Sequence, residues 1–317
     1  MKLSVVIPNY NGEEYLRDCL EALSKQTMSD FDIIIVDNGS TDRSLDTARE
    51  VCPDAVIIML DRNYGFSRAV NEGIRASDAP YVILLNNDTK VLPDFVSELY
   101  NAIRSDEKIF SVSSKMIQMK APDLMDSAGD MYCCLGWAFA RGKDRKETLY
   151  NERTRIFSAC AGAAIYRKKI FEEIGYFDEA HFAYLEDVDV GYRAMICGYR
   201  NIYEPAAVVH HLGSGMSGSR YNKFKISLSS RNNVYLAYKN MPLLQLVINL
   251  PFLIAGYLIK TVFFIRKGEG VTYVKGLIRG LSMCRRDRKF PYRNRNLLNY
   301  IRIQIMLFVN VIYRIKG

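Results

Sequence analysis

The feature that most constrains the fold of this chain is the regular alternation of short apolar runs with amphipathic stretches between residues 3 and 85. The amphipathic stretches carry apolar side chains at helical spacing, as at Leu16, Leu20 and Leu23. Strands that alternate with helices form βαβ units, whose parallel strands share one sheet. We therefore predict an α/β fold with a mostly parallel central sheet, and we expect its first four strands at residues 3–7, 31–36, 55–60 and 81–85.

Polar side chains gather where three of these strands end, at residues 9–11, 37–42 and 86–88. In open α/β sheets the ligand binds outside the carboxyl ends of the strands, so these segments are expected to line the site. Asp88, in the last segment, is a suitable ligand for a hard divalent cation, which in turn can hold a diphosphate. An ordinary Asn-Asp turn is the alternative for the same residues.

The middle of the chain is less regular. Residues 115–155 contain several glycines and the only tryptophan, and we predict a long loop-rich insertion there. Trp137 and Tyr132 are candidates for substrate recognition, and an ordinary surface loop is the equally weighted alternative. After the insertion we expect strands and helices at 156–166 (strand), 168–174 (helix), 185–196 (helix) and 206–210 (strand).

Three carboxylates stand within four positions at Glu186, Asp187 and Asp189. They repel one another unless protons, cations or hydrogen bonds compensate, so the cluster needs an explanation. A helix N-terminus would favour them electrostatically, and a general base that removes a proton from a hydroxyl is the functional alternative. On a helix, Glu186 and Asp189 share a face whereas Asp187 points elsewhere, so the three cannot share one role.

Two further groups of residues are candidates for binding. His210 and His211 are adjacent on a predicted strand, so they point to opposite sides and only one can reach a metal or a phosphate. Arg231 can clamp a diphosphate, with a solvated basic face as the alternative.

The charge of the chain is divided unevenly. Residues 1–218 carry 24 basic and 33 acidic side chains, whereas residues 219–317 carry 19 basic and 2 acidic ones. The segment 243–265 is apolar, 266–295 is basic, and 296–315 is apolar again. This contrast indicates two different tasks for the two parts.

We expect the C-terminal segment to lie in a membrane interface, with its Lys and Arg side chains at anionic headgroups. A single crossing would place the basic stretch on the side opposite the N-terminal part, against the positive-inside rule. A true span or a dipping hairpin, and a dimer interface that gives a homo-oligomer, are the alternatives. We do not predict nucleic acid as a partner, because no motif for it is found.

The seven cysteines are scattered without a CxxC pair, which is typical of reduced thiols in the cytosol. Residues 1–3 lead directly into the first predicted strand, without the longer apolar stretch of a signal peptide. We therefore expect the N-terminal part to remain on the cytoplasmic side.

The order of the motifs is more specific than any one of them. The chain is similar to the family 2 inverting glycosyltransferases, over about residues 3–235 and most closely to the bacterial branch with rhamnosyl and related surface-polysaccharide transferases. The residues that carry the resemblance are the segments 5–12 (VVIPNYNG), 36–42 (VDNGSTD), 63–74 (NYGFSRAVNEGI), 84–89 (LLNNDT), 175–179 (GYFDE) and 184–190 (YLEDVDV). The resemblance implies a GT-A fold in a catalytic domain at 1–235, followed by a helical membrane-associating region at 236–317. It also implies a nucleotide-sugar donor and a divalent metal, Mg²⁺ or Mn²⁺.

The resemblance also implies which residues bind the donor. Pro8, Tyr10 and Asp37 fall where the family holds the nucleotide base. Further donor-binding positions, with Arg231 near the phosphates, are Asn11, Asn63, Asn71, Asn87 and Arg231.

The metal and catalytic positions follow in the same way. Asp88 lies in the family's metal motif, where Asn86 replaces the first carboxylate, and His210 matches a histidine near the metal. Asp187 falls on the catalytic base, with the supporting carboxylates Glu186 and Asp189.

The predicted function is therefore that of an inverting, metal-dependent hexosyltransferase in bacterial surface polysaccharide synthesis, at the cytoplasmic face of the plasma membrane. The acceptor would be a hydroxyl of a glycan or a lipid-linked sugar. dTDP-rhamnose is the first candidate donor and a UDP-hexose the second. A non-catalytic membrane adaptor and a sugar nucleotidyltransferase are the alternatives, whereas an NAD enzyme would need a GxGxxG turn that the first strand lacks.

Overall fold

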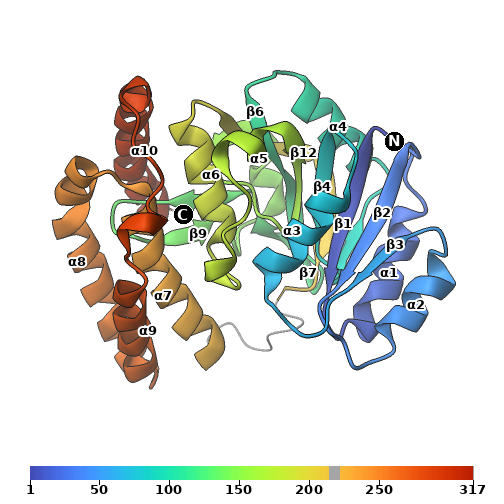
Figure 1. The fold of residues 1–317 in the computed structure, drawn as a ribbon, viewed down its shortest axis with the longest axis horizontal. Coiled ribbons are helices and arrows are strands. Elements are labelled where there is room, and N and C mark those ends of the chain that lie inside the picture. Colours follow the sequence, from blue (N-terminus) through green and yellow to red (C-terminus); the bar gives the residue numbers. More distant parts are fainter. Residues whose placement is uncertain (214–221, 317) are drawn as a thin grey trace.

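The computed structural model describes residues 1–213 and 222–316. Its centre is a ten-stranded mixed sheet with the order β10-β12-β6-β11-β4-β1-β2-β3, to which β5 and β7 are added at β12 and β6. Figure 1 shows this sheet edge-on with helices on both faces, and a separate group of helices at one end. The α/β class and the mostly parallel arrangement that we predicted are confirmed.

The N-terminal half supplies the parallel strands. They are β1 Leu3–Asn9, β2 Phe31–Asp37, β3 Val56–Met59 and β4 Tyr81–Leu85. β1 pairs in parallel with both β2 and β4. Successive strand residues point to opposite faces, so the β1 side chains alternate between two cores. Val6 packs in the core under α3 Phe66–Ala76. Val5 packs in the other core, which lies under three helices, α1 Glu13–Leu23, α2 Ser44–Val51 and α4 Phe95–Arg104.

The second half completes the sheet. β6 Ile109–Gln118 runs parallel to β12 Arg200–His211, and β11 Ala163–Arg167 lies antiparallel between β4 and β6. β5 Thr89–Val91 and β10 Thr154–Ile156 pair antiparallel with β12. α5 Lys168–Ile174 and α6 Glu186–Ile196 pack on the α3 side. The short 3-10 helices are Glu147–Leu149, Glu179–His181, Arg286–Arg288 and Asn294–Asn296.

The predicted insertion is more regular than we expected. β7 Ala121–Ser127 pairs with β6, and β8 Asp130–Tyr132 forms a two-stranded ribbon with β9 Ala138–Ala140. The single strand expected at 156–166 is instead two strands, β10 and β11, joined by a loop. Gly129, between β7 and β8, and Gly136, in the turn of the ribbon, have positive φ values of +89° and +68°, which other residues rarely adopt.

Neither aromatic candidate of the insertion lines the cavity described below. Tyr132 is fully buried, and Trp137 donates its indole N–H to the carbonyl of Gly256 at 3.1 Å. Both therefore anchor the C-terminal helices to the ribbon.

The C-terminal helices form one layer against the ribbon and α6. They are α7 Lys223–Asn240, α8 Leu243–Arg266, α9 Gly270–Ser282 and α10 Leu297–Lys316. α9 approaches α7 closely through two glycines: a Cβ added to Gly276 would lie 1.8 Å from the Ser230 hydroxyl, and one added to Gly280 would lie 2.5 Å from the Arg231 carbonyl. The domain boundary expected at residue 235 falls inside α7, which continues through it.

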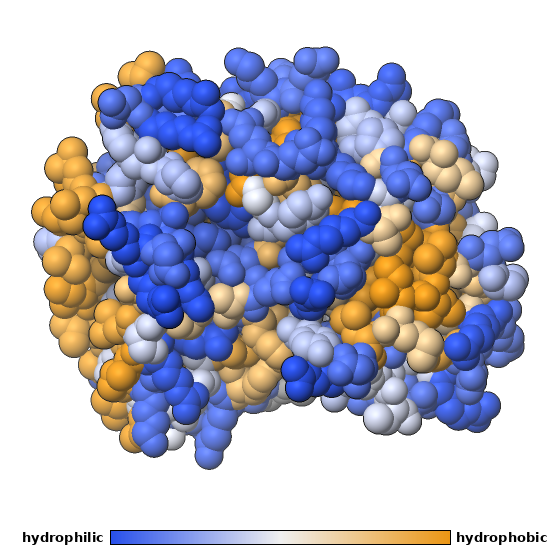
Figure 2. Space-filling view, in the orientation of Figure 1, coloured by the Kyte–Doolittle hydropathy of each residue, from blue (hydrophilic) through white to orange (hydrophobic). Residues whose placement is uncertain are grey.

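The outer surface of this helical layer is apolar. α8 is the one helix, among the described residues, that is long and apolar enough to cross a membrane, with a mean hydropathy of 1.8 and 17% of its most apolar window buried. Leu244 and Leu258 of α8 are 71% and 61% exposed, and Ile278 of α9 is 60% exposed. Figure 2 shows this face as an apolar surface along the edge formed by α8 and α9.

Candidate functional site

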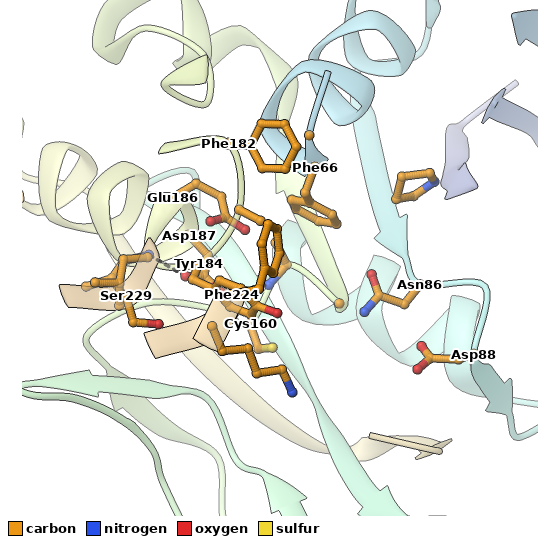
Figure 3. Close-up of a pocket in the computed structure, with 18 of the residues that line it drawn as sticks. Phe66, Asn86, Asp88, Cys160, Phe182, Tyr184, Glu186, Asp187, Phe224 and Ser229 are labelled. Atoms are coloured by element: carbon orange, nitrogen blue, oxygen red, sulfur yellow. Dashed lines mark hydrogen bonds between the residues drawn. The ribbon is translucent and has the colours of Figure 1, made fainter. Parts of the chain in front are cut away.

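A cavity of about 1220 Å³ opens at the carboxyl ends of β1 and β4. This is the edge of the sheet at which the polar segments predicted a ligand site. Figure 3 shows Asn86 and Asp88 on one side of the cavity and Glu186 and Asp187 on the opposite side. Four aromatic side chains complete its walls, Phe66, Phe182, Tyr184 and Phe224.

The predicted donor-binding residues fall into two groups. Pro8, Tyr10, Asn63 and Asn87 line the cavity. Asn63 accepts hydrogen bonds from the Asn38 amide at 3.0 Å and from the Gly65 backbone at 2.9 Å, and it thereby fixes the start of α3.

The other donor-binding candidates hold the backbone around the cavity. Asp37 is 2% exposed and accepts hydrogen bonds from the Asn9 amide and from both the backbone and the hydroxyl of Ser40. Asn11 accepts from the Thr41 backbone at 2.8 Å. Asn71 is 1% exposed and exchanges hydrogen bonds with the backbone of Phe177. These three residues do not line the cavity, so direct donor contacts by them stay a prediction.

Asp88 is paired with His211. The Asp88 carboxylate lies 3.2 Å from Nε2 of His211, whose Nδ1 lies 2.8 Å from the Asp126 carboxylate on β7. Burial opposes the charged imidazole, but the hydrogen bonds with Asp126 and Asp88 outweigh it and raise the pKa of His211 to about 9. Burial also opposes the Asp126 charge, yet His211 and Lys143 lower the pKa of Asp126 to about 2.

His210 is the wrong member of the histidine pair. It pairs with Lys90 in the β5–β12 register and does not line the cavity, whereas His211 does. Burial and the nearby Lys90 lower the pKa of His210. Adjacent strand residues point to opposite faces, and the sequence did not reveal which histidine faces Asp88.

The arrangement of Asp88 and His211 fits a divalent cation. A carboxylate and an imidazole that receives a second carboxylate on its other nitrogen are common at metal sites, because the outer carboxylate fixes the orientation of the ring. Two protein ligands leave coordination positions for diphosphate oxygens, as is usual for Mg²⁺ in nucleotide sites.

Two other groups of residues have metal-ligand geometry. Asp178, His181 and Asp189 lie together, but the Lys239 ammonium occupies the cationic position, 2.7 Å from Asp178 and 2.9 Å from Asp189. The second group, Asp130, Cys160 and Asp187, lies in the cavity.

Glu186 and Asp187 begin α6 and face the cavity. The Asp187 carboxylate accepts a hydrogen bond from the Val188 backbone at 2.7 Å and a longer one, 3.4 Å, from Ala161. Burial raises the pKa of Asp187 against these hydrogen bonds. Glu186 is 6% exposed, and burial with the adjacent Asp187 charge holds its pKa well above the usual range. Oε2 of Glu186 has no hydrogen-bond partner among the described residues.

Asp189 does not reach the cavity. It is fully buried and ion-paired with Arg193 at 2.9 Å and Lys239 at 2.9 Å, and it accepts from the Asn240 amide at 2.8 Å. Burial opposes its charge, but the two cations lower the pKa of Asp189 well below the usual range. The expected catalytic support by Asp189 is therefore corrected to a structural ion pair beneath the site.

The loop before α6 holds an unusual backbone conformation. Phe182, Tyr184 and Leu185 have φ values of 64°, 71° and 69°, in the left-handed region that costs energy for such residues. Asn232 on α7 compensates by donating its amide to three carbonyls of the loop, at 2.7–2.9 Å. Arg231 donates to the His181 carbonyl at 2.7 Å and does not line the cavity, so in this structure it holds the loop.

Sequence reasoning missed two acidic residues of the site, Asp126 and Asp130, and it chose His210 of the histidine pair where the structure places His211 at the cavity. The two aspartates lie in the insertion, where the turn glycines at 129 and 142 are the signal that could have indicated a hairpin. The aromatic wall was also missed, because Phe182 and Phe224 come together only through the packing of the loop on α7.

The fold and the cavity define a class: a GT-A-type transferase, with the Asp88–His211 pair at the sheet edge and the carboxylates Glu186 and Asp187 on the facing wall. The model of the glycosyl transferase family 2 matches residues 4–175, which is more than half of the chain. The chain belongs to this family, and it is a glycosyltransferase.

Individual relatives agree with this assignment. An N-acetylglucosaminyl-diphospho-decaprenol L-rhamnosyltransferase of Mycobacterium tuberculosis is 28% identical over 241 residues, which cover 66% of this chain and 76% of that protein. S. aureus TarS 1–349 in complex with UDP-GlcNAc has a TM-score of 0.61 at 18% identity, with 90% of this chain and 82% of that chain covered. GalNAc-T7 with UDP, GalNAc and Mn²⁺ has a TM-score of 0.60 at 18% identity, over 75% of this chain and 48% of that chain. These structures are similar in fold.

Proposed function

We propose that this protein is an inverting glycosyltransferase that moves a sugar from a nucleotide-diphosphate donor to a hydroxyl of a glycan or lipid-linked acceptor. The single observation that carries the proposal is the placement of Asp187 on the cavity wall facing Asp88, which is paired with His211 (Figure 3). A base and a diphosphate site on opposite sides of one cavity are what a single displacement requires. A single displacement needs no carboxylate nucleophile and no covalent intermediate, unlike the reaction of a retaining glycosidase.

In this mechanism Asp187 removes the proton of the acceptor hydroxyl. The hydroxyl oxygen attacks the anomeric carbon from the side opposite the diphosphate, and the bond from that carbon to the phosphate oxygen breaks. The diphosphate leaves with the bonding electrons, and the configuration at the anomeric carbon inverts. Asp187 is suited to this role because burial raises its pKa, which makes it a stronger base than an exposed aspartate.

Asp88 and His211 would hold the divalent cation, Mg²⁺ or Mn²⁺. The cation supplies charge neutralisation of the leaving diphosphate. Asp126 orients His211 through the 2.8 Å contact with Nδ1, so that Nε2 faces the cavity.

We propose dTDP-rhamnose as the first candidate donor and a UDP-hexose as the second. The first is supported by the relative from M. tuberculosis, whose name gives a rhamnosyl donor and a polyprenyl-diphosphate-linked acceptor. The second is supported by the two similar structures that contain UDP or a UDP-sugar. A teichoic acid poly(glycerol phosphate) polymerase of Staphylococcus epidermidis, 36% identical over 94 residues, is consistent with a place in surface-polymer synthesis.

We further propose that the apolar face of α8, α9 and α10 lies in the cytoplasmic leaflet of the plasma membrane. Its exposed apolar side chains and the 19 basic residues of the C-terminal part are the combination that anionic headgroups attract. This position would bring the cavity to a lipid-linked acceptor.

The test is a donor screen by thermal shift. The full chain is heated with dTDP-rhamnose, UDP-glucose, UDP-galactose, UDP-N-acetylglucosamine or GDP-mannose, each with and without Mn²⁺. A ligand that binds only the folded state raises the melting temperature by mass action. A Mn²⁺-dependent rise with one donor supports the proposal and names the nucleotide, and no rise with any donor in folded protein contradicts it.

Asp187→Asn separates a transferase from an adaptor. The variant should lose at least about 100-fold in transfer, the usual contribution of a general base, and keep the donor-dependent thermal shift. An adaptor would be indifferent to the change. A nucleotidyltransferase would instead release diphosphate from a nucleoside triphosphate and a sugar 1-phosphate, which we expect this protein not to do.

A further inference from the structure

A second carboxyl group faces the proposed base inside the cavity. Asp130 is the first residue of β8, and no motif of the sequence includes it. Its carboxyl oxygen, that of Asp187 and the Cys160 sulfur all lie within 4.8 Å of one another. Both aspartates line the cavity, so they are partly open to whatever binds there.

The backbone fixes the position of Asp130 relative to Asp187. Asp130 and Ser158 exchange two backbone hydrogen bonds, of 2.8 and 3.0 Å. The Ser158 hydroxyl donates to the carbonyl oxygen of Asp187. One residue, Ser158, is therefore bonded to both aspartates, and this is the type of support that holds a reacting group in a defined geometry.

Two carboxylates this close in a largely buried site repel each other when both are ionised, which favours retention of one proton by the pair. Burial, the Asp187 charge and the hydrogen bond between the two hold the pKa of Asp130 well above its usual range. The same hydrogen bond acts to lower the pKa of Asp187 against burial. The other groups that act most strongly on Asp130, Asp126 and Glu186, are also acidic. The neighbouring Cys160 thiol stays neutral, because burial raises its pKa as well.

We propose that Asp130 is a positioning residue for the transfer: as a neutral carboxylic acid it donates a hydrogen bond to Asp187 and directs the free, ionised oxygen of Asp187 towards the acceptor hydroxyl. The proton of the acceptor moves to Asp187, Asp130 keeps its own proton, and the electron pair of the broken O–H bond forms the new bond to the anomeric carbon. The inference rests on the proposed function, since it takes Asp187 as the base.

The experiment compares Asp130→Asn with Asp130→Ala in the full chain. The asparagine amide is neutral and donates the same hydrogen bond, whereas alanine donates none. The rate of transfer from dTDP-rhamnose to a short-chain N-acetylglucosaminyl-diphospho-farnesol is measured from pH 5 to pH 9. Asp123→Asn, an exposed position on the neighbouring strand β7, is the matched control.

We expect the transfer rate of Asp130→Asn to stay within about threefold of the wild-type rate. The acid limb of its pH–rate profile, where the rate falls as the pH is lowered, should be unchanged. Asp130→Ala should lose about tenfold, and its acid limb should move up by about one pH unit, because a hydrogen bond to a charged group is lost and the pKa of Asp187 rises. A purely structural role would lower the melting temperature in both variants and leave the limb in place. The inference is wrong if the alanine variant keeps the wild-type profile, or if the asparagine variant is as impaired as the alanine variant.

A second readout does not depend on activity. At neutral pH the infrared difference spectrum between wild type and Asp130→Asn should contain a buried neutral-carboxyl band that is missing from the difference between wild type and the Asp123→Asn control, whereas the Glu186 band is common to all three proteins. If the wild type transfers no sugar but shows this band, the proposed function fails and the shared proton stands. If the band is the same in wild type and Asp130→Asn, the inference fails whatever the activity.

Discussion

Replacement of Asp189 by asparagine tests whether the third carboxylate of the cluster acts in stability or in chemistry. The side chain is fully buried and accepts from Arg193 at 3.0 and 2.9 Å, from Lys239 at 2.9 Å and from Asn240 at 2.8 Å. Asparagine keeps the volume and removes the charge, so both cations lose their shared counter-ion. Breaking a buried pair costs about 3–5 kcal/mol.

The lower end of that range applies here. Lys239 keeps its contact with Asp178 at 2.7 Å, and Arg193 still donates to backbone carbonyls, including that of Tyr176 at 2.8 Å. We therefore expect Asp189→Asn to lower the stability by about 3 kcal/mol. For a chain of 317 residues such a loss lowers the melting temperature by about 4–5 °C.

The assay is thermal unfolding of the full chain followed by circular dichroism, with transfer measured well below both melting temperatures. Glu186→Gln is the matched control: the pKa of Glu186 is already raised well above its usual range by burial, so glutamine replaces a neutral acid and should change the stability by under about 1 kcal/mol. Asp189→Asn should transfer sugar at close to the wild-type rate at low temperature.

The stability difference also has a defined pH dependence. The pKa of Asp189 is lowered in the folded state, so its contribution is complete above the unfolded value of about 3.9 and is lost as the pH falls through the folded value. The difference between wild type and variant should thus be constant from pH 7 to about pH 5 and shrink below about pH 4. An unchanged melting temperature, or loss of transfer in a fully folded variant, would refute the structural role.

Three other outcomes are expected. Asn232→Ala removes the amide that holds three loop carbonyls in place, and it should lower the transfer rate at least tenfold, about 1.4 kcal/mol of barrier, while the donor-dependent thermal shift persists. In the metal-free protein, the pKa of His211 is about 9 in the folded state against about 6.5 in the unfolded state. Its contribution to stability is therefore complete below about pH 6.5 and lost as the pH rises through about 9. His211→Asn should flatten this part of the curve of melting temperature against pH. Leu258→Glu should reduce binding to vesicles that contain phosphatidylglycerol, measured by flotation, whereas Val56→Glu on β3, at a similar 51% exposure, should not.

The local elements of the fold could be predicted because their signals are local. The apolar face of α1 with Leu16 and Leu20, and the stop of α5 at Gly175 with φ +81°, are set by residues within one or two turns. The edge of the sheet that carries the cavity could also be predicted, since parallel strands bring their carboxyl ends together. For the same reason Asp88 and Asn87 were placed correctly at the cavity.

The rest of the site depends on register and on contacts distant in sequence. His211 faces Asp88 because β12 pairs with β5 in one register, and a shift by one residue would have exposed His210 instead. Asp130 reaches Asp187 only through its bridge with Ser158. The rule that residues three apart share a helix face grouped Glu186 with Asp189. The helix begins at Glu186, directly after Leu185 in the left-handed conformation, and Glu186 and Asp187 in its first turn face the cavity.

The contacts of α7 show why the C-terminal helices cannot be treated as an addition to a finished catalytic domain. The middle of α7 carries Arg231 and Asn232, which hold the strained loop before Asp187, and its C-terminal end carries Lys239, which neutralises Asp189. α7 in turn is fixed by the close approach of Gly276 and Gly280 on α9. A chain ending at residue 235 would leave Asp189 without one of its two cations. It would also remove the packing of α9 on α7 that positions Arg231 and Asn232 against the loop. The helices that we propose to contact the membrane therefore also hold the base in position, so their attachment to a bilayer and the geometry of the cavity are mechanically connected.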